Sequence, residues 1–247
     1  MLRGTADIEA LAAGVATIPF FLAEPVVFDS VYCLQCTAEM GNEAREAVLP
    51  PSLHPTVPPA VSVQGWEICG SPWGDFQMVL TRVYCRSGAR ARGFTVSAFI
   101  STDDAAEGMA RTFGYPAQVA HIHFRHGYDG ADLVLSVHGE EAIRINATDP
   151  EPMGPDDVQY TSTLNLAQTP NGLRLVQVET HHQTGRVDRL TARMPVFRGD
   201  LLGNPLLHAR QVVSGSLTQG SVEYPVVRFV CRPDELAFTG TEPVSAA

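Results

Sequence analysis

The chain contains no lysine, and all 17 of its lysine-or-arginine positions are arginine. A soluble chain of this length usually carries on the order of a dozen lysines. Because a Schiff base with a carbonyl needs a primary amine, no side chain here can form one. The α-amino group of Met1 is the one remaining primary amine, and we expect it to stay outside any site because termini usually fray. Coding bias in a GC-rich genome is the alternative explanation of the missing lysines.

Other features that the sequence lacks exclude further classes of protein and ligand. No run approaches the roughly 20 apolar residues of a membrane-spanning helix. A net charge of -10 disfavours nucleic acid and membrane surfaces as partners. There is no dinucleotide-binding glycine motif, phosphate loop or serine nucleophile elbow, so we expect no cofactor. The five cysteines form no even framework, and Cys33 and Cys36 are interpreted as small core residues. We therefore expect a cytoplasmic protein whose partner is a small molecule.

What the chain does have is many short runs rich in β-branched and aromatic residues, separated by turn signals. This spacing predicts an α+β fold, mainly antiparallel β, with a closed or double barrel and few short helices. We expect an N-terminal segment over residues 1–25, one domain over 26–240 and a tail over 241–247. The predicted strands are 26–36, 61–68, 76–85, 93–100, 119–124, 133–137, 142–146, 164–166, 173–180, 187–194, 214–219 and 226–230.

Two helices are predicted between the strands. The clearer one begins after Ser101 and Thr102, whose side chains can accept hydrogen bonds from the free N–H groups of a first turn. It ends at Gly114, a candidate left-handed cap. The second is expected over residues 39–48, and residues 149–157, with three prolines, are expected to form an exposed loop.

Two histidine clusters are candidates for chemistry. His121 and His123 share one face of a strand and could bind zinc or transfer protons. Ile122 between them occupies the apolar phase, which favours an exposed position for both histidines. Glu179, His181 and His182 form the second cluster. Glu179 and His181 share a strand face and could act as an acid–base or metal pair, but the end of a surface hairpin is the better explanation.

The chain also resembles the acetoacetate decarboxylase family in the order and spacing of several motifs between residues 26 and 230. Those motifs are AVLPPSL at 47–53, GDFQMVL at 74–80, STDD at 101–104, RTFGYP at 111–116, RGDLL at 198–202, PLL at 205–207 and QVVSG at 211–215. The resemblance implies the family's cone-like double barrel and a homo-oligomer. In the family two lysines follow the tyrosine–proline step, and one of them forms the Schiff base with the substrate.

This sequence departs from that pattern at three points. Tyr115 and Pro116 are followed by Ala117 and Gln118, and neither position holds the arginine that coding bias would substitute. The strand that supplies a pocket glutamate in the family has no acid between residues 76 and 83. The arginine expected near the first strand is missing from residues 28–32. The resemblance therefore implies a changed reaction.

Three functions from different classes follow. The first is a lysine-independent lyase, cyclase or dehydratase that acts on a carbonyl-rich or polyketide-like intermediate of specialised metabolism by shape and hydrogen bonding. The second is a non-catalytic pseudoenzyme that binds a small ligand, and the third a histidine-dependent metal lyase or hydrolase. For the first, the predicted catalytic residues are Tyr115, Gln118 and His121, and the predicted pocket residues are Gln77, Met78, Phe99 and Ala117.

Overall fold

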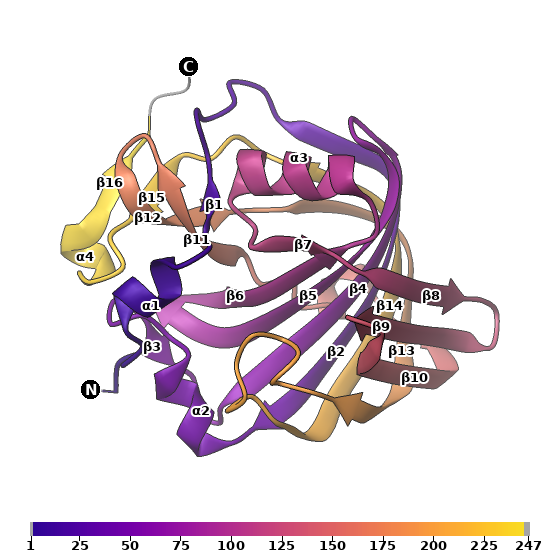
Figure 1. The fold of residues 1–247 in the computed structure, drawn as a ribbon. Coiled ribbons are helices and arrows are strands. Elements are labelled where there is room, and N and C mark those ends of the chain that lie inside the picture. The colour runs from indigo at the N-terminus through magenta and orange to yellow at the C-terminus, as the bar shows by residue number, and fades with distance from the viewer. Residues whose placement is uncertain (1, 245–247) are drawn as a thin grey trace.

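The computed structural model describes residues 2–244, which form one large, strongly bent sheet with a few short helices (Figure 1). The strands are β1 (Ala16–Thr17), β2 (Val26–Met40), β3 (His54–Pro55), β4 (Ala60–Ser71), β5 (Gly74–Ser87), β6 (Arg90–Ile100), β7 (Ala117–Val119), β8 (His121–His126), β9 (Gly130–Val137), β10 (Glu140–Pro152), β11 (Thr163–Thr169), β12 (Gly172–Val178), β13 (His181–Phe197), β14 (Ala209–Tyr224), β15 (Phe229–Cys231) and β16 (Thr241–Pro243). The helices are α1 (Ile8–Ala12), α2 (Asn42–Ala47), α3 (Asp103–Phe113) and α4 (Ala237–Gly240).

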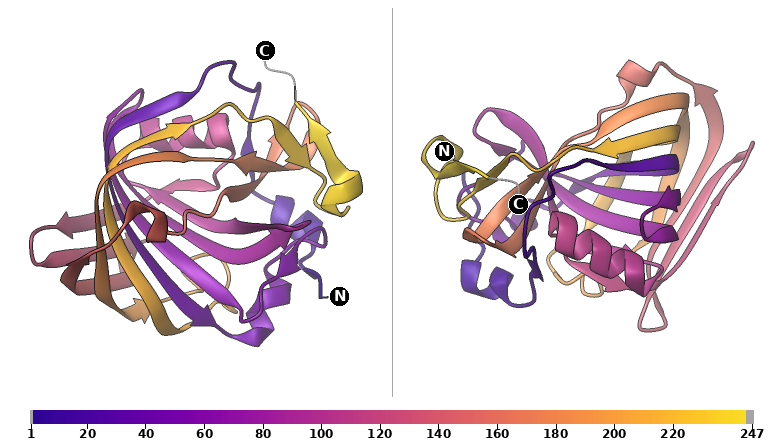
Figure 2. Two further views of the ribbon diagram at one scale, coloured as in Figure 1. Left: turned by 180° about the vertical axis from the view of Figure 1, so that it is seen from behind. Right: turned by 90° about the horizontal axis from the view of Figure 1, so that it is seen from above.

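The main path through the sheet runs in the order β16-β15-β12-β11-β6-β5-β4-β2-β14-β13-β10-β9-β8. Most neighbours are antiparallel, and the parallel pairs are β1 with β11, β6 with β7 and β6 with β11. The predicted mainly antiparallel α+β class is confirmed. The sheet curls around a concave face without closing (Figure 2), because β16 and β8 end the path without pairing with each other. In that respect it differs from the closed barrel that the spacing predicted.

Both faces of the sheet are covered, and strand β2 shows how the sequence achieves this. Val31 and Cys33 point to one face, where they join a cluster with Trp66 and the buried side of α3. Leu34 and Cys36 point to the other, where β8, β9 and β10 fold back over the sheet. Alternation of side chains across a strand places neighbouring residues in different cores. The interpretation of Cys33 and Cys36 as core residues is confirmed, since both are buried.

Helix α3 forms as predicted and packs against the concave face through Ala105, Ala106, Met109 and Phe113. It ends at Gly114, whose φ of 71° is the left-handed conformation that glycine adopts most easily. The predicted side-chain cap is wrong in one respect. The N-cap is Thr102, whose side chain makes no capping hydrogen bond, and the Ser101 hydroxyl instead accepts a hydrogen bond from the Gln77 N–H at 2.8 Å.

Several predicted boundaries of strands, helices and loops differ from the structure. Strand β2 continues to Met40, so the second helix spans only Asn42–Ala47. Strand β10 continues to Pro152, beyond register shifts in its pairing with β13, and a single 3-10 turn follows at Pro155–Asp157. Both ends of the chain contribute strands, since β1 pairs with β11 and β16 pairs with β15. Met1 lies outside the described residues.

Within residues 2–244, none of the helices has the length and apolar character needed to cross a membrane.

Gly114 and Gly203 provide a matched test of this packing because both have a positive φ, of 71° and 88°. A Cβ at Gly114 would lie 2.7 Å from the Cβ of Ala167, whereas a Cβ at Gly203 would meet nothing within 4 Å. We expect Gly203→Ala to cost about 1 kcal/mol of unfolding free energy from backbone strain alone. We expect Gly114→Ala to cost about 2 to 4 kcal/mol because overpacking is added. Urea denaturation measures both, and equal losses would contradict this account of the α3 terminus.

Candidate active site

A small polar cavity lies on the concave face of the sheet, beside the apolar cluster that α3 covers. Its volume is about 10 Å³, close to the space that one water molecule occupies. It lies among β4, β5, the turn after α3, the segment before β11 and the facing ends of β13 and β14. The lining residues are Gln64, Trp66, Leu80, Arg82, Tyr115, Tyr160, Thr161, Thr163, Thr180, His182 and Tyr224.

Arg82 is the one arginine of this cavity, and only 2% of its surface is exposed. Its Nη1 donates to the Thr161 carbonyl at 2.8 Å and to the Thr163 hydroxyl at 3.0 Å. Its Nε and Nη2 groups have no hydrogen-bond partner among the described residues. No aspartate or glutamate lines the cavity. A buried cation is usually paired, so these free donors favour a site for an anionic or strongly polarised oxygen.

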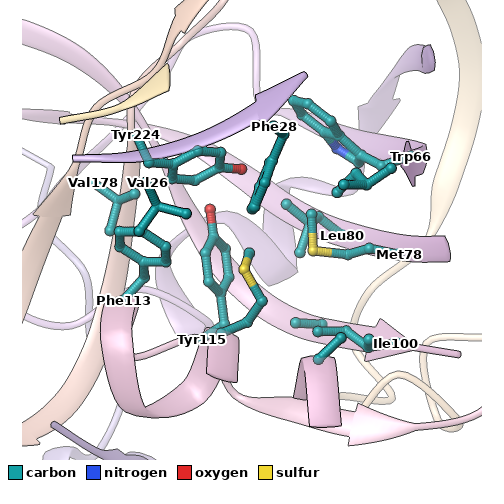
Figure 3. Packing of buried hydrophobic residues seen from close by; sticks show 14 of the residues in the cluster. Val26, Phe28, Trp66, Met78, Leu80, Ile100, Phe113, Tyr115, Val178 and Tyr224 are labelled. Atoms are coloured by element: carbon teal, nitrogen blue, oxygen red, sulfur yellow. The ribbon is translucent and has the colours of Figure 1, made fainter. Parts of the chain in front are cut away.

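Two buried tyrosines, Tyr115 and Tyr224, bring their hydroxyl groups together beside this cation. Figure 3 shows the hydroxyl oxygens of the two side chains pointing toward each other, with Phe113 and Phe28 packed beside them. Burial raises the pKa of both phenols, while the positive charge of Arg82 opposes the rise at each. Both hydroxyls therefore stay protonated near neutral pH and can donate hydrogen bonds to a bound oxygen.

His182, on β13, adds a potential proton acceptor. Its ring stacks on Tyr160 with a centroid distance of 3.5 Å and an interplanar angle of 10°. Its Nε2 lies 3.0 Å from the Thr180 hydroxyl. Burial, with a smaller contribution from the charges of Arg82 and His181, lowers the pKa of His182 to about 4. The imidazole is thus neutral at physiological pH and has a lone pair available.

The segment that carries Tyr160 separates the cavity from a larger groove of about 400 Å³. Gln159 and Val158 line the groove, while Tyr160 and Thr161 line the cavity. A chain of amides bridges the two spaces. The Gln64 amide donates to Gln35 at 2.6 Å, and the Gln35 amide donates to the Gln159 carbonyl at 3.3 Å. Displacement of this segment would join the cavity to the groove.

The structure distributes the residues predicted from sequence among three places. Tyr115 lines the cavity, Met78 lies in the same buried cluster, and the half-buried Ala117 packs against that cluster. Phe99 is buried in the cluster on the opposite face. Gln77 also faces that side, where its amide donates to Glu67 at 3.1 Å and to the Phe124 carbonyl at 3.4 Å.

The remaining two predicted residues, Gln118 and His121, are exposed and do not line the cavity. Gln118 lies on β7, which pairs with the end of β6, and His121 begins β8. Both are close in sequence to Ala117, at the edge of the region where the family's lysines are expected. Their catalytic roles stay predictions.

Sequence reasoning did not identify Arg82, Tyr160 or Tyr224, and it named His182 only as a member of the second histidine cluster. For Arg82 a signal existed, because it is the only charged residue between Asp75 and Arg86 in a strand that is otherwise almost entirely apolar. The others come from separate strands and from an irregular segment, and only the tertiary fold brings them together.

Apart from His182, the predicted members of the two histidine clusters do not line the cavity. His121 and His123 are exposed while Ile122 is buried, as the alternation predicted. Glu179 lies 3.8 Å from Arg92, and His181 lies 3.5 Å from Glu223, so these two do not pair with each other. Among residues 2–244, no three histidine, cysteine, aspartate or glutamate side chains are grouped so that they could hold a metal ion.

Comparison with known proteins identifies a family from the sequence and a shared fold from the structure. A profile of the acetoacetate decarboxylase family matches residues 14–197. The chain is similar in structure to an acetoacetate decarboxylase from Legionella pneumophila, with a TM-score of 0.72 and 17% identity over 85% of this chain and 88% of that chain. It is similar to the enduracididine biosynthesis enzyme MppR complexed with pyruvate, with a TM-score of 0.67 and 18% identity over 91% and 92% of the two chains.

A third similar structure is an acetoacetate decarboxylase-like enzyme from Sphingomonas wittichii RW1, with a TM-score of 0.64 and 13% identity over 92% of this chain and 95% of that chain. These likenesses show a shared fold. No curated protein matches the sequence.

The depressed pKa of His182 predicts a dependence of stability on pH. The pKa of the imidazole is 6.5, its ordinary value, in the unfolded chain and about 4 in the folded protein. Stability from this residue is therefore present above the unfolded value and is lost as pH falls toward the folded value. The loss reaches at most about 3 kcal/mol.

Urea unfolding at pH 7 and near the lower value measures this loss in the wild type and in His182→Gln. We expect His182→Gln to show little of this pH-dependent loss of stability. The control variant His123→Gln, which removes an exposed histidine, should show the full loss. The same pH dependence in the wild type and His182→Gln would show that another group is responsible.

Proposed function

Because the chain belongs to the acetoacetate decarboxylase family, we propose that it is a lysine-independent enzyme that uses the fold's concave cavity for carbonyl chemistry. The reaction class is that of a lyase, dehydratase or cyclase acting on a carbonyl-rich intermediate of specialised metabolism. Without a lysine it has no side chain for Schiff-base chemistry. Catalysis then depends on preorganised hydrogen-bond donors and on a positioned base.

The observation that carries this proposal is the pair of unpartnered N–H groups on buried Arg82, in a cavity that no carboxylate lines. A substrate carbonyl oxygen beside these groups and the Tyr115 hydroxyl would be polarised. If a proton leaves the neighbouring carbon, the negative charge collects on this oxygen as an enolate. A fixed cation and fixed hydrogen-bond donors in a buried site stabilise that charge more strongly than water does.

His182 is the candidate base for this proton, since Nδ1 is the ring nitrogen that does not contact Thr180. The C–H electron pair forms the enolate double bond and the proton moves to the imidazole. The imidazolium can then return the proton to a leaving β-hydroxyl, which departs as water, or the enolate carbon can attack a second carbonyl and close a ring. Burial is the main cause of the low pKa of His182, and the charge of Arg82 adds to it. Negative charge beside Arg82 offsets this second effect, so the ring becomes a better base when the substrate binds.

The cavity volume of about 10 Å³ is too small for such a substrate, which must enter by displacing the Tyr160 segment. This closed state favours a second candidate function, in which the chain binds a small ligand without converting it. Similarity in fold to MppR, solved with pyruvate, supports an oxo-acid as a first ligand for either function.

Exchange of pyruvate methyl protons for deuterium in D2O, followed by NMR, tests the proposal without knowledge of the full reaction. We expect the wild type to accelerate exchange, and Tyr115→Phe and Arg82→Met each to slow it by about 10²- to 10³-fold, because each removes donors to the enolate oxygen. Gln118→Ala tests the exposed residue that the sequence analysis predicted to be catalytic. If it slows exchange as much as Tyr115→Phe does, Gln118 also takes part in catalysis.

The lysine-free chemistry has its own control. Borohydride added with pyruvate should leave no covalent adduct in the mass spectrum of the protein. Binding of pyruvate without exchange above the uncatalysed rate would favour the non-catalytic ligand-binding function. A stable adduct would overturn the lysine-independent mechanism and direct attention to the Met1 amine, which lies outside the described residues.

A further inference from the structure

A second groove, of about 330 Å³, lies between the turn of the β5–β6 hairpin and the C-terminal elements. We call it the C-terminal groove. A Cβ built on Gly88 in that turn would lie 3.6 Å from the Cβ of Ala237, so the turn and α4 are in close proximity. The lining residues are Ser87, Gly88, Ala89, Arg90, Arg92, Gln177, Phe229, Ala237, Phe238 and Thr241. None of them belongs to the cavity around Arg82.

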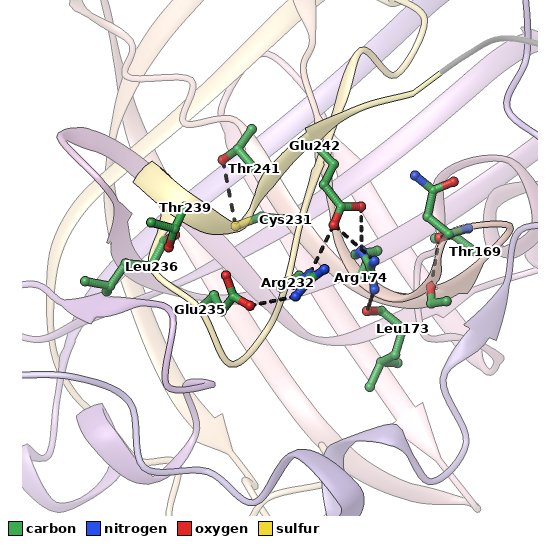
Figure 4. Close-up of polar contacts among 12 residues, drawn as sticks. Thr169, Leu173, Arg174, Cys231, Arg232, Glu235, Leu236, Thr239, Thr241 and Glu242 are labelled. Atoms are coloured by element: carbon green, nitrogen blue, oxygen red, sulfur yellow. Dashed lines mark hydrogen bonds and ion pairs between the residues drawn. The ribbon is translucent and has the colours of Figure 1, made fainter.

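The wall of the groove formed by β15, α4 and β16 is held by ion pairs (Figure 4). Glu242 accepts from Arg174 at 3.1 and 3.2 Å and from Arg232 at 3.1 Å, and Glu235 accepts from Arg232 at 2.7 Å. The Thr241 hydroxyl donates to the Ala237 carbonyl at 2.7 Å and ties α4 to β16. Figure 1 shows α4 and β16 beside β15 and β12 at this end of the sheet. These contacts hold in place the two elements that carry the aromatic residues of this wall, β15 with Phe229 and α4 with Phe238.

The opposite wall carries two arginines with little compensation. Arg90 and Arg92 are two residues apart on β6, which places them on the same face of the strand. Arg92 is 6% exposed, its Nε has no hydrogen-bond partner, and its one carboxylate contact is Glu179 at 3.8 Å. The ion pairs of this region join Arg92, Arg174 and Arg232 to glutamates, and none between residues 2 and 244 includes Arg90.

The pKa of Arg92 is lowered chiefly by burial; the Glu179 carboxylate opposes this shift, and repulsion from Arg90 adds to it. The two guanidinium groups thus concentrate positive charge in a groove that no aspartate or glutamate lines, on a chain whose net charge is -10. An anion between them would relieve that repulsion and pair with the buried donors of Arg92.

Two large aromatic side chains complete the groove. Phe229 is 46% exposed and Phe238 is 87% exposed, which makes Phe238 one of the two most exposed large hydrophobic residues described in the chain. Exposed aromatic surface next to a concentration of positive charge matches a ligand with an apolar ring at one end and an anionic group at the other.

We propose that the C-terminal groove is a binding site for a small aromatic carboxylate, with the carboxylate between Arg90 and Arg92 and the ring against Phe229 and Phe238. This site is separate from the cavity of the proposed reaction and does not rest on that proposal. The groove volume of about 330 Å³ lies within the range of ordinary small-molecule sites.

Isothermal titration calorimetry of the full chain with 2-naphthoate tests the site, with 2-naphthamide as the neutral match. We expect saturable binding of the acid with a Kd below about 1 mM and binding of the amide at least about tenfold weaker. Arg90 is exposed, so we expect Arg90→Gln to fold normally. The substitution should raise the Kd of 2-naphthoate by about tenfold and leave the Kd of 2-naphthamide unchanged. Phe238→Ser should weaken the binding of both ligands.

Controls separate this groove from other arginines. Arg111→Gln removes an exposed arginine on α3 that is paired with Glu107 at 3.0 Å, and it should leave binding of the acid unchanged. The proposal is overturned by three results: no saturable binding of 2-naphthoate, acid binding that Arg90→Gln and Phe238→Ser leave intact, or loss of binding in Arg82→Met with retention in Arg90→Gln. The last result would place the acid in the cavity on the concave face.

Discussion

A single sheet that bends as far as this one must bury both of its faces, and the remaining elements serve that requirement. Strand β2 sends Val31 and Cys33 to the concave core and Leu34 and Cys36 to the convex one. The long neighbours β4, β5 and β14 continue both layers. Helix α3 covers the concave side and β8 to β10 fold back over the other. Polar residues on the concave side are consequently enclosed, whatever their sequence context.

Enclosure gives Arg82 its importance. On an exposed strand an arginine would be solvated and chemically unremarkable, but here its charge reaches Cys33, Tyr115, His182 and Tyr224 and shifts their pKa values. Low dielectric strengthens each of these effects. No side chain of this protein can perform the family's covalent chemistry, and the positive charge that remains in the cavity is delocalised and non-nucleophilic. Such a charge can stabilise an anion but cannot attack a carbonyl.

The sequence predicted those features of the fold that short-range interactions determine. The polar start and glycine end of α3, the alternation of Ile122 with its histidine neighbours and the burial of Cys33 all follow from short-range periodicity. Closure of the sheet depends on whether β8 meets β16, which no local pattern records. The cavity was predicted only at Tyr115, because His182 and Tyr224 come from strands more than sixty residues away along the sequence.

The stacked pair of Tyr160 and His182 has a thermodynamic consequence for any molecule that occupies the cavity. The binding-competent population is the fraction of molecules in which this stack is broken and the Tyr160 segment displaced. An apparent dissociation constant equals the intrinsic one divided by that fraction, so a weakly binding protein can hide a tight site. Selectivity among ligands then depends on two properties: how well a ligand fits the cavity, and how strongly it favours separation of Tyr160 from His182.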